Sequence, residues 1–180
     1  MPPADIDRDF LSATLAGLIR INSVNPSLVP GAPGEAEAAA FVAAVLRRLG
    51  LGVQLAEAAP GRPSVVGVLP GTGGGRSLML NGHLDTVGVD GMPEALVPAV
   101  RGGRMFGRGS YDMKGGVAAC LAAVKALVDG RVALRGDVVL AAVADEEYAS
   151  LGTADVAARL RVDGAIVAEP ALARIDPLFE

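Results

Sequence analysis

The 180-residue chain has one histidine, one cysteine and no tryptophan. The lone cysteine, Cys120, excludes an intrachain disulfide, and its place on the apolar face of an expected helix predicts a core residue. The lone histidine, His83, limits any metal site in this chain to one imidazole. A serine hydrolase is disfavoured as well, because Ser110 lacks the Gly-x-Ser-x-Gly turn and the chain has no second histidine.

Aromatic residues and positive charge are also scarce. Aromatics make up 3% of the chain and the net charge is −4. Base stacking needs aromatic side chains and phosphate binding needs basic ones, so we expect no nucleic-acid partner. No apolar run approaches the roughly 20 residues of a membrane span, and the N-terminus lacks the basic and apolar regions of a secretory signal. These absences predict a cytoplasmic protein without a membrane partner.

What the chain does have is an apolar content of 51%, rich in Ala, Val and Leu, which suffices for a sizeable core. Its second half alternates strand and helix patterns, and this predicts an α/β fold with a mixed, mainly parallel sheet and helices on both faces. The last ten residues show no clear element. Periodicity and breakers predict helices at 5–21, 35–49, 114–129 and 150–160, and strands at 53–56, 64–69, 77–81, 105–106, 137–144 and 164–168.

Polar motifs follow three of these strands. His83 comes after strand 77–81, Glu146 and Glu147 after 137–144, and Glu169 after 164–168. Ligand sites of such sheets lie beyond the carboxyl ends of the strands, so we expect these side chains to meet. Asp112, in a glycine-rich turn that enters a helix, can join them. Imidazole and carboxylate are ligands for Zn²⁺, Co²⁺ and Mn²⁺, and the set predicts a metal site.

Each motif alone has a plainer interpretation. His83 could be a hydrogen-bonded histidine at a strand end, the adjacent glutamates a solvated loop, and Glu169 a cap before a proline. The glycine run 71–75 is interpreted as a flexible turn, because it lacks the Gly-Lys-Ser/Thr ending of a phosphate loop and precedes a strand. The metal-site hypothesis therefore depends on the motifs occurring together.

Four segments occur in one order along the chain, and together they carry a family resemblance. They are Gly82-His83-Leu84-Asp85-Thr86-Val87, Gly107-Arg108-Gly109-Ser110-Tyr111-Asp112-Met113-Lys114-Gly115-Gly116, Asp145-Glu146-Glu147 and Glu169-Pro170. With them, residues 5–170 resemble the dinuclear zinc metallopeptidase family that includes acetylornithine deacetylase, succinyl-diaminopimelate desuccinylase, aminoacylase and glutamate carboxypeptidase. Four ordered motifs are far more specific than any one of them.

The resemblance implies a role for each matching residue. His83, Asp112 and Glu169 would bind one zinc ion, and Asp112 and Glu147 would bind a second, with Co²⁺ or Mn²⁺ as alternatives. Glu146 would be the general base and Asp85 would orient His83. The implied reaction is hydrolysis of the amide bond in an N-acyl amino acid or a small dipeptide, with Glu146 taking a proton from water and delivering it to the leaving amine.

The chain also departs from the family. Members supply the second metal with a histidine from a later part of a longer chain, and they carry an inserted lid or dimerisation domain. We therefore interpret residues 1–180 as the N-terminal portion of the catalytic domain, with the lid domain and the C-terminal catalytic segment absent. We expect one metal at moderate affinity and a second that is weak or absent, unless another copy in a homo-oligomer supplies the histidine.

Three functions follow as hypotheses. The first is a metal-dependent amide hydrolase similar to acetylornithine deacetylase or succinyl-diaminopimelate desuccinylase. The second is a catalytically inactive remnant that binds one metal or serves in protein interactions. The third is an aminoacylase or dipeptidase of the same fold.

Overall fold

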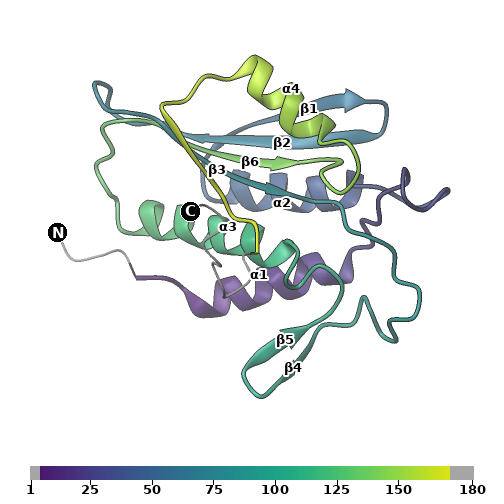
Figure 1. The fold of residues 1–180 in the computed structure, drawn as a ribbon. Coiled ribbons are helices and arrows are strands. Elements are labelled where there is room, and N and C mark those ends of the chain that lie inside the picture. Colours follow the sequence, from purple (N-terminus) through teal and green to yellow (C-terminus); the bar gives the residue numbers. More distant parts are fainter. Residues whose placement is uncertain (1–4, 171–180) are drawn as a thin grey trace, which may run out of the picture.

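The computed structural model describes residues 5–170 of the chain, and the final ten residues lie outside this range. Its helices and strands alternate most regularly in the second half, as the sequence predicts (Figure 1). The elements are α1 (Arg8–Arg20), α2 (Ala36–Arg48), β1 (Gly52–Ala59), β2 (Arg62–Leu69), β3 (Leu78–His83), β4 (Ala99–Arg101), β5 (Arg104–Phe106), α3 (Lys114–Asp129), β6 (Val138–Val143), α4 (Leu151–Arg159) and β7 (Gly164–Val167).

Five strands form one mixed sheet in the order β1-β2-β6-β3-β7. β1 pairs with β2, and β2 with β6, in antiparallel fashion, whereas β6, β3 and β7 run parallel. The predicted α/β class with a mixed sheet is confirmed. Parallel pairing is confined to the three strands that precede the functional motifs, so these motifs emerge at the same edge of the sheet.

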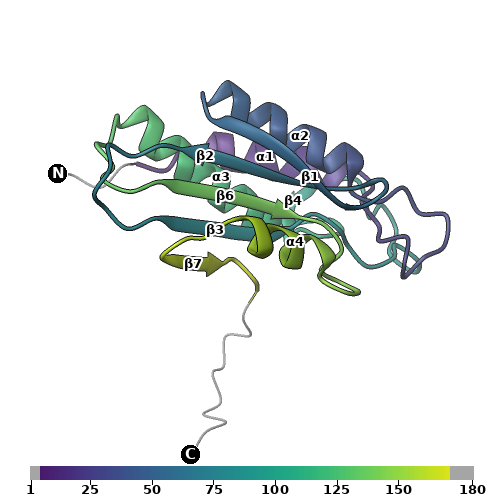
Figure 2. The ribbon, with the colours of Figure 1, turned by 90° about the horizontal axis from the view of Figure 1, so that it is seen from above.

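Helices cover both faces of the sheet. Figure 2 shows α1, α2 and α3 on one face and α4 on the other. The larger core lies between the sheet and the first three helices, and includes Leu121 and Cys120 of α3. A smaller core under α4 includes Val156 and Val139. Cys120 is buried as predicted, and all six residues of β6 are buried because this strand has a neighbour on each side and helices on each face.

Element boundaries differ from the prediction where tertiary pairing overrides local pattern. The strand predicted at 53–56 extends over Gly52–Ala59, because its antiparallel pairing with β2 continues to the Ala59–Arg62 pair. The short strand predicted near 105–106 has a partner, β4. The two strands join at Gly102 and Gly103, whose φ angles of 57° and 75° suit a tight hairpin turn that other residues rarely adopt.

The helix predicted to begin at residue 5 begins at Arg8. Asp7 precedes it as the N-cap, and its carboxylate accepts a hydrogen bond of 2.9 Å from the main-chain N–H of Phe10. This satisfies one of the unpaired donors of the first turn and fixes the helix start. Among residues 5–170, no helix has the length and apolar character that a membrane crossing requires.

Candidate metal centre

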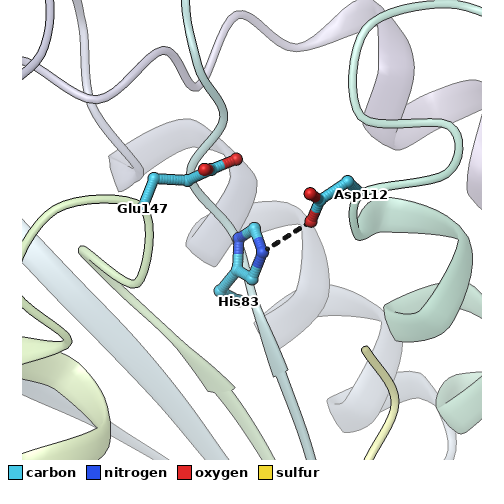
Figure 3. Close-up of side chains that lie close together, drawn as sticks. All are labelled: His83, Asp112 and Glu147. Carbon is cyan, nitrogen blue, oxygen red and sulfur yellow. Dashed lines mark hydrogen bonds and ion pairs between the residues drawn. The ribbon is translucent and has the colours of Figure 1, made fainter. Parts of the chain in front are cut away.

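His83 is the last residue of β3 and lies beside Val143, the last residue of β6. Glu146 and Glu147 follow β6 directly, and Glu169 lies two residues beyond the end of β7. Since the three strands are adjacent and parallel, their ends deliver these side chains to one place. Asp112 reaches the same place from the turn before α3 (Figure 3). The structure thus brings together all the residues predicted for the metal site.

The Nε2 atom of His83 is the centre of this arrangement. It lies 3.0 Å from Asp112 Oδ1, 3.6 Å from Glu146 Oε2 and 3.7 Å from Glu169 Oε1. The imidazole is fully buried, whereas these three carboxylate side chains are 53%, 39% and 40% exposed. A buried nitrogen therefore faces carboxylates that remain accessible from solvent.

Two sets of donor atoms could each surround a single ion. One consists of His83, Asp112 and Glu147, and the other of His83, Glu146 and Glu169; the atoms of each set lie within 4.8 Å of one another. Imidazole nitrogen with carboxylate oxygen is a donor chemistry that zinc, cobalt and manganese share. The residues present therefore fit a divalent metal. The division of ligands differs from the one the family resemblance implies, and the roles of all five residues stay predictions.

The other ring nitrogen of His83 is already engaged. Its Nδ1 donates to the main-chain oxygen of Asp85 at 2.9 Å, and the Asp85 carboxylate lies 3.5 Å away. This arrangement leaves Nε2 as the atom that faces the carboxylates, which is the orientation a metal ligand needs. The role of Asp85 in orienting His83 stays a prediction, and the hydrogen bond that Nδ1 donates goes to the main-chain oxygen of Asp85.

Asp85 also holds the loop that carries the two glutamates. Its Oδ1 accepts a hydrogen bond from the main-chain N–H of Glu146 at 3.0 Å, and its Oδ2 accepts one from Glu147 at 3.1 Å. A third donor, Asn25 Nδ2, lies 2.7 Å from Oδ2. One fully buried carboxylate thus couples the imidazole to the main chain of both glutamates.

The electrostatics of the site follow from this crowding of acids. Burial lowers the pKa of His83, but the hydrogen bond to Asp85 and the charges of Asp85, Glu169 and Glu146 outweigh it and raise the pKa to about 9. Burial raises the pKa of Asp85, yet its hydrogen bonds to His83 and Asn25 and the charge of His83 lower it overall. In the absence of metal, a protonated His83 therefore acts as the counterion of the site.

The pKa values of two glutamates are raised, in contrast to that of Asp85. Burial raises the pKa of Glu147, and the neighbouring carboxylates add to this although the charge of His83 opposes it. The pKa of Glu169 is raised in the same way, by burial first and then by Glu146, Asp112 and Asp85. A cation among these groups would relieve the repulsion that raises both values.

The turn that carries Asp112 is held by close packing. Met113 is fully buried, and its sulfur accepts a hydrogen bond of 3.1 Å from the main-chain N–H of His83. Lys114 is buried as well, and its Nζ donates to the main-chain oxygen of Ile21 beyond the end of α1 at 2.8 Å. Burial lowers the pKa of Lys114 to about 8. These contacts anchor the chain directly after Asp112.

Gly116 allows α3 to approach the segment that carries Glu169. A Cβ atom at Gly116 would lie 2.3 Å from the main-chain oxygen of Ala168. We expect Gly116→Ala to destabilise the chain by about 1–3 kcal/mol through overpacking, although alanine favours a helix, and to weaken zinc binding by displacing Glu169. Urea unfolding and a zinc-competition titration measure the two effects.

Gly52→Ala is the matched control, because a Cβ there meets nothing within 4 Å. It should change neither quantity. A Gly116→Ala chain as stable as the parent would show that α3 does not pack against Ala168 in this way.

The raised pKa of His83 makes the metal-free chain sensitive to pH. The pKa is about 9 in the folded chain against 6.5 unfolded, so the folded state binds the proton more tightly. The resulting stability, on the order of 3 kcal/mol, is complete below pH 6.5 and is lost as pH rises through about 9. Zinc must displace the same proton, so zinc affinity should rise by up to about tenfold per pH unit over this interval.

Urea unfolding with a chelator present and zinc titrations between pH 6.5 and 9 test both statements. His83→Gln is the control for stability. In the His83→Gln chain, the loss of stability between pH 6.5 and 9 should vanish. The lowered pKa of Lys114 should leave a rise in stability above pH 8, because the unfolded state then binds more protons than the folded state. Equal pH profiles for the two chains would contradict the assigned His83 environment.

Three buried polar residues behind the site were not singled out by the sequence analysis. They are Asn25, Glu35 and Arg62. Their side-chain partners lie 27 to 120 positions away, so no local sequence pattern predicts these contacts. The available signal was weak: Arg62 is a charged residue two positions before the predicted strand 64–69, and its position alone does not distinguish burial from exposure.

Comparisons with known proteins place this geometry in a family. The sequence pattern of Peptidase family M20/M25/M40 matches residues 79–177, which cover His83 and all four predicted carboxylates around it. The chain belongs to this family. Its proteins are metal-dependent, in agreement with the donor set described above.

Among curated relatives, the chain is 38% identical over 145 residues to an N-formyl-4-amino-5-aminomethyl-2-methylpyrimidine deformylase of Halalkalibacterium halodurans, covering 77% of this chain and 34% of that protein. It is 35% identical over 173 residues to a succinyl-diaminopimelate desuccinylase of Methylobacterium sp., covering 88% and 41%. An M20 family metallo-carboxypeptidase of Sulfolobus solfataricus shares the fold, with a TM-score of 0.77, 24% identity and coverage of 90% and 38%. The chain thus spans well under half the length of these relatives.

Proposed function

We propose that this chain is the metal-binding part of an amide hydrolase that removes acyl groups from small N-acyl substrates. The observation that carries the proposal is the convergence of the only imidazole of the chain with four carboxylates at the ends of β3, β6 and β7. Membership of the M20/M25/M40 family supports it, as do two relatives whose names describe removal of a formyl and of a succinyl group.

His83, Asp112 and Glu169 would hold one zinc ion, and Asp112 with Glu147 would hold a second. The chemistry that bound zinc supplies is Lewis acidity toward the scissile carbonyl. Co²⁺ and Mn²⁺ suit the same donors. With three donors for one ion and two for the other, we expect the 180-residue chain to bind the first ion more tightly.

Glu146 has the general-base role in this proposal. Its side chain is 39% exposed and its Oε2 lies 3.6 Å from His83 Nε2, so it can reach both solvent and the site. The hydrogen bond from the main-chain N–H of Glu146 to Asp85 fixes the main-chain position from which this side chain extends. Glu146 would accept a proton from the attacking water and donate it to the leaving amine.

A substrate panel with added zinc tests the activity. It should contain an N-formyl aminomethylpyrimidine, N-succinyl-diaminopimelate, N-acetylornithine and a dipeptide. We expect hydrolysis that is linear in enzyme and abolished by a chelator, with an acyl-amine preferred over the dipeptide. Preference for the dipeptide would instead support the dipeptidase hypothesis.

One result would contradict the proposed activity but not the proposed metal site. A chain that binds zinc but hydrolyses no member of the panel would support the alternative function, an inactive metal-binding remnant. The control for the zinc titration and the substrate panel is the His83→Ala chain, which should bind no zinc and show no hydrolysis above background.

A further inference from the structure

A second group of polar side chains is buried behind the metal centre, away from the exposed carboxylates. Arg62 at the start of β2 binds Glu35 at the start of α2 through two hydrogen bonds of 2.6 Å, from Nε to Oε2 and from Nη2 to Oε1. Its Nη2 also donates to Asp145 Oδ1 at 2.8 Å. Arg62 is 8% exposed, and Glu35 and Asp145 are fully buried. Such a buried cluster of charges is stable only where each charge is paired and hydrogen-bonded in good geometry.

Asn25 joins this cluster to the metal centre. Its Nδ2 donates to Asp145 Oδ1 at 3.1 Å and to Asp85 Oδ2 at 2.7 Å. Its Oδ1 accepts from the main-chain N–H of Ser27 at 2.9 Å, so all its polar atoms point in fixed directions. A continuous path of hydrogen bonds thus runs from Arg62 through Asp145 and Asn25 to Asp85.

The path fixes the main chain as well as the side chains. Asp145 directly precedes Glu146 and has a φ of +65°, an uncommon conformation for a residue other than glycine. Its N–H donates to Glu35 Oε1 at 3.2 Å, and its main-chain oxygen accepts from Ala149 and Ser150. Within residues 5–170, Asp145 Oδ2 has no hydrogen-bond partner, so Asp145 depends on Arg62 and Asn25.

We propose that Arg62 and Asn25 are positioning residues of the metal centre. They hold Asp85 and Asp145 in place, and through these the His83 ring and the main chain of Glu146 and Glu147. This inference rests on the proposed metal site and adds to it that zinc affinity is set partly by residues that touch neither the metal nor its ligands. Outer partners of metal ligands typically change affinity by 10–100-fold.

A purely structural role would look different. In that case, changes at Arg62 would lower the stability of the chain. Zinc affinity would then fall no more than in a variant that is equally destabilised elsewhere. Zinc affinity measured beside stability therefore separates the two roles.

The test variants are Arg62→Lys and Asn25→Ala. Lysine keeps the charge but cannot form the forked pair of bonds, and alanine at position 25 removes the link to Asp85. We expect each to weaken zinc binding by about 10–100-fold and to alter the visible absorption spectrum of the cobalt-loaded chain. Competition titration with a zinc chelator gives the affinity, and urea unfolding gives the stability.

Two controls match these changes. Arg159→Lys makes the same substitution at an exposed arginine that pairs with Asp155 on α4. Leu140→Ala removes a fully buried core side chain and lowers stability by creating a cavity. Neither should shift zinc affinity by more than about twofold.

Zinc affinities of Arg62→Lys and Asn25→Ala within about twofold of the parent would overturn the inference, provided that the parent binds zinc. Failure of the parent itself to bind zinc would contradict the proposed metal site instead. If either variant does not fold, Glu35→Gln takes its place, because it keeps the shape of Glu35 while removing the charge that holds Arg62.

Discussion

Substitution of Asp85 by alanine is expected to destabilise the metal-free chain by about 3–5 kcal/mol and to lower zinc affinity by at least about 100-fold. Asp85 is fully buried and accepts hydrogen bonds from Asn25 and from the main chain of Glu146 and Glu147. Its removal leaves these donors unpaired and the His83 cation without its one fully buried counterion. Urea unfolding and zinc-competition titration measure the two losses.

The amide variant sharpens this test. Each carboxylate oxygen of Asp85 faces a donor, so Asp85→Asn must point its own NH₂ group at one of them. We expect a loss of stability comparable to that of alanine despite the conserved shape. Asp129→Ala, at an exposed carboxylate paired with Lys125, should change little. An Asp85→Asn chain with parental stability would show that Asp85 does not hold the glutamate loop.

The second large effect concerns Glu146. We expect Glu146→Gln to retain bound zinc and to lower the rate of amide hydrolysis by about 10²–10⁴-fold, because glutamine keeps the shape of the side chain but cannot accept a proton. Steady-state rates on the N-acyl substrate that the parent hydrolyses best provide the measurement, with zinc content determined on the same preparation.

The zinc content also decides between two roles that the geometry allows. Glu146 belongs to one of the two donor sets around His83, so it could be a ligand rather than a base. A ligand role predicts that Glu146→Gln loses zinc affinity together with activity, as Asp112→Asn should. Full activity in Glu146→Gln would contradict both roles and leave the proton transfer to another group.

The site residues could be predicted from the sequence because each one stands next to a readable strand or helix. His83, Glu146, Glu147 and Glu169 follow apolar strands that run parallel, and a parallel sheet gathers such positions at one edge. The glycine-rich turn that carries Asp112 into α3 could likewise be recognised in the sequence. Local pattern and topology were sufficient for these positions.

The support behind the site could not be predicted in this way. The contacts of Arg62 with Glu35 and Asp145 span 27 and 83 positions, and those of Asn25 with Asp85 and Asp145 span 60 and 120. Such contacts depend on strand order, and antiparallel β2 beside β6 is what brings Arg62 to Asp145. Polar residues near a helix end or a turn are usually solvated, so burial of these side chains is visible only in the fold.

The most direct test of the metal centre is the zinc content of the purified 180-residue chain, measured by elemental analysis after loosely held metal has been removed. We predict about one zinc ion per chain in the parent and none in His83→Ala, since His83 is the only imidazole available. A parent without zinc, or a His83→Ala chain with as much zinc as the parent, would contradict the metal centre described here.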